Sequence, residues 1–347
     1  MTETEIQSPM PARKITPIWP LEFDLRPMLL LPAIALVALP LVGSSSTWLT
    51  LTVAGLAMGM IIFITASGVT LVFGLMDVLN FGHGLFIAFG AYVAVATLGP
   101  LVDWTGSPEL WRNLVALGCA MPAAMIAAAA LGAAFERIIV RPVYGKHLKQ
   151  ILITMGGGII GEELIKVIWG PSQIPLPLPE ALRGAVSLGD ASLSRYRILA
   201  VIIGLVICAA LVWSLNRTKV GLLVRADVQD REMVEALGYR IGRLFVGVFV
   251  TGSALAGLGG VMWGLFQQNL VPQMGVQVNV LIFIVAQNYL QDLLALGNKA
   301  AASLPPFAAV LSPDRWLLWL GLLFVLSVYF FPTGIVGTLR GTPERKH

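Results

Sequence analysis

The sequence predicts an all-α protein, a polytopic bundle of roughly eight to nine transmembrane helices. Of its 347 residues, 57% are hydrophobic and only 12% are charged, whereas a soluble domain carries about 25% charged residues. Apolar runs of about 20 residues recur along the chain, and this length crosses a hydrocarbon core about 30 Å thick. The ten-residue alternating strands of a membrane barrel are missing from the sequence, so helices must satisfy the backbone polar groups in lipid.

Nine apolar runs are predicted to be membrane helices. They are residues 28–47, 49–75, 84–102, 113–134, 150–169, 196–215, 244–267, 278–297 and 315–331. Together they make a transmembrane domain over residues 28–340, in contact with membrane lipid. A polar leader (1–27) precedes it and a charged tail (341–347) follows, and both are expected on the cytoplasmic side. The leader lacks the charged, apolar and small-residue pattern of a cleaved signal peptide and is expected to stay attached.

Basic residues predict the orientation of the bundle. Loop 136–150 has four Lys or Arg residues and loop 216–243 has six, so both are expected on the cytoplasmic side. Two predicted spans lie between these loops, and an even number of crossings places both loops on the same side of the membrane. The N-terminus is then cytoplasmic, and segment 170–197 is an external ordered loop or short lateral helix. The basic C-terminal tail is also expected inside, but nine spans that start from a cytoplasmic N-terminus would place it outside. Either segment 278–297 does not cross the membrane or one span is miscounted.

Composition excludes several classes of function. The two cysteines lie in apolar runs and are interpreted as small buried side chains. No metal site, cofactor or catalytic motif is predicted, so the chain is not expected to be an enzyme. The net charge of +4 is spread over short loops, and no nucleic-acid partner is expected.

Small residues recur every four positions in one predicted helix. They are Gly252, Ala256, Gly260 and Gly264. Stripes of this kind let membrane helices approach closely, so a helix-packing role is predicted. A nucleotide-binding loop is excluded because the Lys that follows the glycines of such a loop is missing.

The loop 216–243 contains a predicted short helix, "DVQDREMVEALG" (227–238). Asp227 caps its start, acidic residues fill its first turns and Gly238 ends it. Met233, Val234 and Leu237 form a small apolar face. Two interpretations stay open: a charged loop that only orients the protein, or a docking helix for a cytoplasmic partner.

Three charges interrupt the predicted span 150–169. Glu162 and Lys166 are spaced to form an i, i+4 ion pair, with Glu163 beside them. Charges in a span are costly. They are expected to face the bundle or to extend toward the outer interface, with direct contact to a substrate as the alternative.

A polar stretch, "LMDVLNFGHG" (75–84), separates two apolar runs. Asp77, Asn80 and His83 are its polar side chains, and Gly82 and Gly84 permit a break between helices. Broken helices present backbone groups to the substrate in transporters. These five residues are therefore the candidates for a substrate pathway, with an ordinary turn at the inner face as the alternative.

This stretch carries a family resemblance. "GVTLVFGLMDVLNFGHGLFIAFGAYVA" (68–94) resembles the signature of the LivH-type permease subunits of branched-chain amino acid ABC importers. The matching positions are Gly68, Thr70, Leu71, Phe73, Gly74, Met76, Asn80, Phe81, His83, Gly84 and Gly90–Tyr92. Segments 136–154, 221–244, 253–264 and 331–337 are also similar, so the resemblance covers about residues 50–340.

The resemblance implies a multi-pass subunit of the bacterial inner membrane that imports branched-chain amino acids or related small amino acids or amides. Its implied partners are a second homologous permease, two cytoplasmic ABC ATPase subunits and a periplasmic substrate-binding protein. It also implies ATPase coupling by the loop 216–243. The residues assigned to that coupling are Arg225, Asp227, Asp230, Glu232, Leu237 and Gly238.

The sequence departs from the family pattern after Val285: it goes straight to "AQNYLQDLL", without the Gly-rich turn and about one helix that the family pattern has there. This is also where the charge parity fails. Three alternatives stay open: a sugar-type ABC permease of the same superfamily, a stand-alone secondary carrier or channel, and a shortened variant that does not transport.

Overall fold

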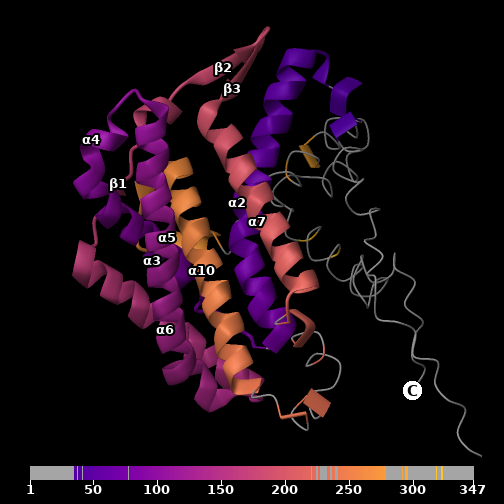
Figure 1. Cartoon of the computed structure of the whole chain (residues 1–347), viewed down its shortest axis with the longest axis vertical. Coiled ribbons are helices and arrows are strands. Elements are labelled where there is room, and N and C mark those ends of the chain that lie inside the picture. The colour runs from indigo at the N-terminus through magenta and orange to yellow at the C-terminus, as the bar shows by residue number, and fades with distance from the viewer. Residues whose placement is uncertain are drawn as a thin grey trace, which may run out of the picture.

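Six long helices dominate the described part of the computed structural model (Figure 1). The structure describes residues 35–36, 38–40, 42–76, 78–219, 221–223, 226, 233–234, 237–238, 241–278, 291, 294–295, 318 and 322. The long helices are α2 (Ser45–Met76), α3 (His83–Leu98), α5 (Leu110–Phe135), α6 (His147–Trp169), α7 (Arg195–Arg217) and α10 (Ile241–Gln267). The shorter ones are η1 (Gly99–Leu101), α4 (Val102–Thr105), η2 (Glu136–Val140), η3 (Arg141–Val143) and η4 (Glu180–Leu182).

Helices form where the apolar runs predict them. The runs 49–75, 84–102, 113–134, 150–169, 196–215 and 244–267 all fall on these helices. Residues 28–34, 37 and 41 of the first predicted span, and all but a few residues of spans 278–297 and 315–331, lie outside the described residues. Five helical segments of the described chain are long and apolar enough to cross a membrane: Ser45–Met76, His83–Thr105, Leu110–Val143, Arg195–Arg217 and Ile241–Gln267. α6 is not one of them, because it carries Glu162, Glu163 and Lys166.

The described residues also form four short strands, which the prediction of an all-α chain did not include. β2 (Ala185–Leu188) and β3 (Ala191–Ser194) form an antiparallel hairpin. β1 (Ile174–Pro175) pairs with β4 (Asn269–Leu270), also antiparallel. Segment 170–197 is thus an ordered loop built on strands, with only the single turn η4 in place of a lateral helix. Its hairpin turn is Gly189-Asp190, with Gly189 at φ +60°, and a Gly-Asp pair between strands is a hairpin signal.

α10 is the central helix of the bundle. It packs against α2, α3 and α5, and most of its residues are buried, including Phe249, Ala256 and Met262. α7 packs against α2, and α6 covers α3. In Figure 1 α10 lies between α3 and α5 on one side and α2 and α7 on the other.

The described parts of the two basic loops lie at one end of the bundle, which agrees with the side predicted for them. The ring of Tyr144, which follows η3, is 5.6 Å from that of Phe245 in the first turns of α10. We call this the basic end, defined by residues 136–146, the last turn of α7 and the first turn of α10. The β2–β3 hairpin lies at the opposite end (Figure 1).

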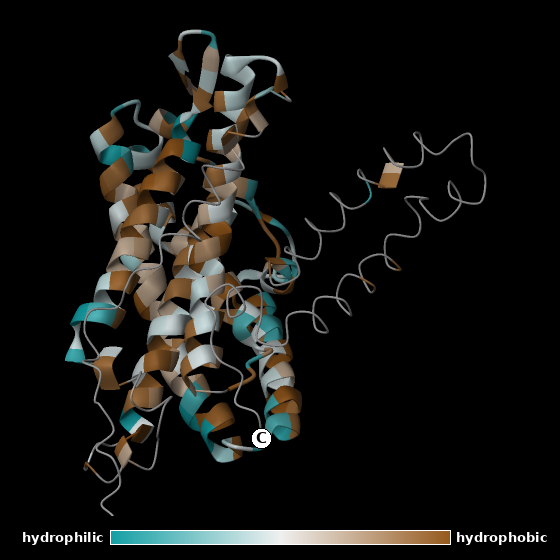
Figure 2. Cartoon of the chain, turned by 90° about the vertical axis from the view of Figure 1, so that its right-hand side faces the viewer, coloured by the Kyte–Doolittle hydropathy of each residue, from teal (hydrophilic) through white to brown (hydrophobic). Residues whose placement is uncertain are grey.

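Hydrophobic side chains cover the outside of the helices as well as the core. Brown, hydrophobic residues dominate the helical surfaces in Figure 2. Val167 of α6 is 80% exposed and Trp213 of α7 is 64% exposed. Surfaces of this kind are stable in lipid and unfavourable in water. The chain is a multi-pass membrane protein.

Candidate functional site

The stretch between α2 and α3 is a helix break inside the bundle. α2 ends at Met76, and α3 begins only at His83. The imidazole of His83 lies against Gly68, where a Cβ atom would be 3.0 Å from Cε1. Gly68 precedes the end of α2 by eight residues, or about 12 Å at 1.5 Å per residue. The chain therefore returns about 12 Å into the bundle before α3 starts.

Side-chain hydrogen bonds hold the break. The Oδ1 atom of Asn80 accepts a hydrogen bond from the backbone N–H of Gly82 at 3.0 Å. The Oγ1 atom of Thr154, on α6, accepts one from the backbone N–H of Phe81 at 3.2 Å. Thr154 is fully buried and donates to the carbonyl of Gln150 at 2.6 Å. α6 is thus tied to the break by one hydroxyl group.

Two glycines let other backbones approach the break. A Cβ atom on Gly82 would be 2.6 Å from the carbonyl oxygen of Thr154. A Cβ atom on Gly275 would overlap the carbonyl oxygen of Gly84. The segment 271–278, which follows β4, therefore returns into the bundle and rests on the first turn of α3.

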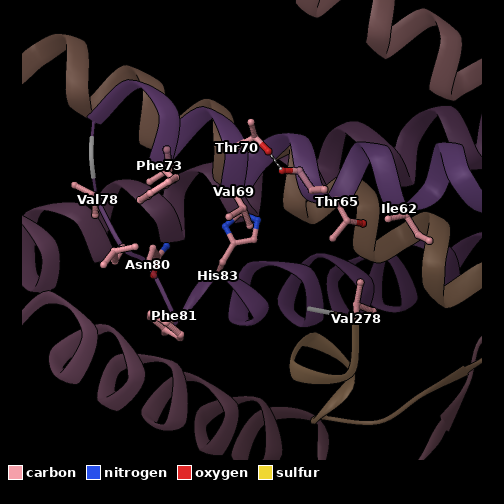
Figure 3. Close-up of a pocket in the computed structure, with 13 residues that line it drawn as sticks. Ile62, Thr65, Val69, Thr70, Phe73, Val78, Asn80, Phe81, His83 and Val278 are labelled. Atoms are coloured by element: carbon pink, nitrogen blue, oxygen red, sulfur yellow. Dashed lines mark hydrogen bonds between the residues drawn. The ribbon is translucent and has the colours of Figure 1, made fainter. Parts of the chain in front are cut away.

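The break borders a cavity of about 490 Å³. Val278 and residues of α2, the break and the start of α3 surround it. Its lining is Ile62, Thr65, Ala66, Val69, Thr70, Val72, Phe73, Val78, Leu79, Asn80, Phe81, His83 and Val278. Figure 3 shows the imidazole of His83 pointing from α3 toward α2, with Asn80 and Phe81 to one side and Val278 to the other.

Two polar groups of the cavity wall have no partner among the described residues. His83 is 1% exposed, and its Nε2 atom and the Nδ2 atom of Asn80 are buried without a hydrogen bond. Buried polar atoms normally have partners, and small-molecule sites combine apolar walls with a few polar groups. The cavity can therefore bind a small solute that is partly apolar and partly polar. Asp77 lies outside the described residues.

The predicted small-residue stripe lies on α10. A Cβ atom on Gly252 would be 2.8 Å from the carbonyl oxygen of Gly68. A Cβ atom on Gly260 would overlap the carbonyl oxygen of Ile87. A Cβ atom on Gly264 would be 2.7 Å from a methyl group of Leu270. Ala256 is fully buried. The tight contacts are not confined to one face, however.

Gly257 faces Ala128 of α5, and Gly259 faces Thr65 of α2. Sequence reasoning missed Gly257 and Gly259 because it followed a single four-residue period. Thr154 and Gly275 were also missed. A lone Thr in an apolar run and a Gly next to Val carry no distinctive pattern.

The predicted coupling helix is described only in part. Met233 and Val234 are helical, and the N–H of Leu237 donates to the carbonyl of Met233 at 3.1 Å. Gly238 has φ +84°, a conformation that favours glycine and ends a helix. Val234 is buried, whereas Leu237 is 66% exposed. Arg225, Asp227, Asp230 and Glu232 lie outside the described residues.

Comparison with curated proteins finds bacterial permeases. The chain is 27% identical to the high-affinity branched-chain amino acid transport system permease protein LivH of Salmonella typhimurium, over 82% of this chain and 93% of that protein. LivH of Escherichia coli K12 gives the same identity and coverage. The corresponding permease BraD of Pseudomonas aeruginosa is 26% identical, over 82% of this chain and 94% of its own length. No solved structure matches the chain.

The family described as "branched-chain amino acid transport system / permease component" matches residues 51–286. The match includes the helix break, the cavity wall up to Val278, and α10. It ends one residue after Val285, where the sequence departs from the LivH-type pattern. Because the match covers more than half of the chain, the chain belongs to the family of branched-chain amino acid transport system permease components.

Proposed function

We propose that the chain is the membrane-spanning permease subunit of an ATP-driven importer for branched-chain amino acids or related small amino acids or amides. The observation that carries the proposal is the cavity at the helix break, which lies within the family-matched region. Its apolar wall suits an aliphatic side chain, and the unpaired Nε2 of His83 and Nδ2 of Asn80 suit the polar groups of the solute. The cavity is then one part of the substrate pathway.

The proposed assembly contains a second homologous permease, two ABC ATPase subunits and a periplasmic substrate-binding protein. The basic end faces the cytoplasm, since the sequences of the two loops predict that side, and the hairpin end receives the binding protein. The subunit resides in the bacterial inner membrane with eight to nine spans. Gly252, Ala256, Gly260 and Gly264 serve close packing of α10 rather than transport chemistry.

Uptake measurements with the whole assembly test this function. Cells that express the chain with its neighbouring permease, ATPase and binding-protein genes are expected to accumulate a labelled branched-chain amino acid, and ATP depletion is expected to stop the accumulation. Uptake by this chain alone, insensitive to ATP, would instead identify a stand-alone carrier.

The exposed Leu237 supports a coupling role for the loop 216–243. Changing Leu237 to Asp, Arg225 to Glu or Glu232 to Arg is expected to lower ATP-driven uptake while the chain still inserts into the membrane. An apolar contact or a charge pair with the ATPase would be lost, and removing one partner of a buried charge pair costs about 2–5 kcal/mol. The measurement compares uptake with the amount of chain in the membrane. Normal uptake in all three variants would contradict the coupling role.

The departure after Val285 supports a topology prediction. A helix-length insertion between Val285 and Ala286, about 20 residues, is expected to move the C-terminus from the periplasmic to the cytoplasmic side. Paired C-terminal reporters, one active only in the cytoplasm and one only in the periplasm, measure the side. The prediction is wrong if the unmodified chain already gives a cytoplasmic signal.

A further inference from the structure

α6 carries an ion cluster on a face that is otherwise apolar. The Nζ atom of Lys166 lies 2.9 Å from a carboxylate oxygen of Glu162 and 2.7 Å from one of Glu163. The i, i+4 pair predicted from the sequence is therefore present. Two carboxylates and one ammonium group leave one negative charge. The side chain of Glu163 is 63% exposed, against 22–23% for the other two.

The cluster lies near half-depth in the bundle. A Cβ atom on Gly161 would overlap the side chain of Leu85, in the first turn of α3. α3 itself starts about 12 Å from the end of α2, so Leu85 lies about 15 Å from that end at 1.5 Å per residue. The last residue of α6, Trp169, packs against Phe89 and Tyr92 further along α3, so the cluster lies between these two levels. α2 has 32 residues and is about 48 Å long at 1.5 Å per residue, so this level is well inside the bundle. Figure 1 agrees: α6 leans outward from the basic end, and its last turn is near half the height of the bundle.

The exposed face around Glu163 is suited to protein rather than lipid. Ile159, Ile160 and Val167 are its neighbours at helical spacing, and they are 63%, 64% and 80% exposed. A carboxylate at this depth cannot reach either interface easily, because its side chain is short. Lipid tails provide no hydrogen bond or positive charge.

We infer that this face of α6 binds a transmembrane helix of the second permease subunit, and that this helix presents a Lys or Arg to Glu163. The charge on the cluster is negative, so a basic side chain complements it. The apolar residues on both sides of Glu163 supply the rest of the contact. The inference rests on the two-permease assembly in the proposed function and adds the contact surface and its chemistry.

Charge reversal tests the inference in the assembled protein. The tagged chain is co-expressed with the neighbouring permease, ATPases and binding protein and purified from membranes in mild detergent. Glu163→Lys is expected to lower the amount of co-purified second permease about tenfold or more. Changing the basic residue of the partner to Glu is expected to restore it. Glu109→Lys is the matched control, because Glu109 also pairs with a cation three residues later, Arg112 at 2.9 Å, and is 49% exposed.

Cysteine cross-linking supplies the second readout. In a chain with Cys119 and Cys208 changed to Ser, a Cys at Val167 is expected to cross-link to the second permease, and a Cys at Val206, 60% exposed on α7, is not. Cross-links only between two copies of this chain, or no cross-link at Val167, would overturn the inference. So would unchanged co-purification of Glu163→Lys. If the wild-type preparation contains no second permease, the proposed two-permease assembly is wrong as well. If the wild type co-purifies with it and Glu163→Lys does so equally well, only the inferred contact on α6 is wrong.

Discussion

Changing Gly260 to Ala is expected to destabilise the bundle and remove transport. The added Cβ atom would overlap the carbonyl oxygen of Ile87, which belongs to the backbone of α3 and cannot rotate away. Overpacking of a core costs about 1–3 kcal/mol, and we expect the upper end of that range at this position. The thermal unfolding midpoint of the purified chain in detergent measures the loss, and uptake in cells measures its consequence.

The same helix provides the control. Gly247 is an exposed residue of α10, and a Cβ atom there meets no atom within 4 Å. Gly247→Ala is expected to leave the midpoint unchanged or to raise it slightly, since Ala is favoured over Gly in a helix by about 0.5–1 kcal/mol. Equal midpoints for the two variants would show that α10 and α3 are not packed as closely as described.

Changing Thr154 to Val is expected to abolish most uptake with only a moderate loss of stability. Valine keeps the shape of Thr154 but removes the oxygen that accepts from the N–H of Phe81. An unpaired buried N–H costs about 1–3 kcal/mol. The helix break is then free to move away from α6, and the wall of the cavity moves with it. Uptake rates of the wild type and the variant, at equal amounts in the membrane, measure the effect.

Thr154→Ser separates a positioning role from a packing role. Serine retains the hydroxyl and loses the methyl group, so it is expected to preserve most uptake. A packing role predicts the reverse order, with Val better tolerated than Ser. That order would contradict the role of the hydroxyl in holding the break.

The helices of this chain could be predicted from the sequence because each apolar run is long enough to span a bilayer. The contact of Tyr144 with Phe245 agrees with the prediction that the two basic connections share an end. The strands could not be predicted as easily. β1 and β4 have two residues each and are separated by almost a hundred residues, so no local period reveals them. The β2–β3 hairpin has a local signal at Gly189-Asp190, which the sequence analysis did not use.

The sequence position of the candidate site could be predicted, but its three-dimensional arrangement could not. The glycines and polar residues of 75–84 indicated a break between helices. Its depth became visible only from the contact of His83 with Gly68, eight residues before the end of α2. The contributions of Thr154 and Gly275 depend on α6 and the segment after β4 returning to the break, and such long-range contacts are not encoded in local spacing.

Thiol modification at Val69 tests the central claim, that the cavity at the helix break lies on the substrate pathway. Val69 lines the cavity and is 36% exposed. In the chain with Cys119 and Cys208 changed to Ser, Val69→Cys is expected to react with a small polar methanethiosulfonate reagent, to lose uptake on modification, and to react more slowly when a branched-chain amino acid is present. Val206→Cys on α7 is expected to show none of these effects. Full modification of Val69→Cys with normal uptake would contradict the claim.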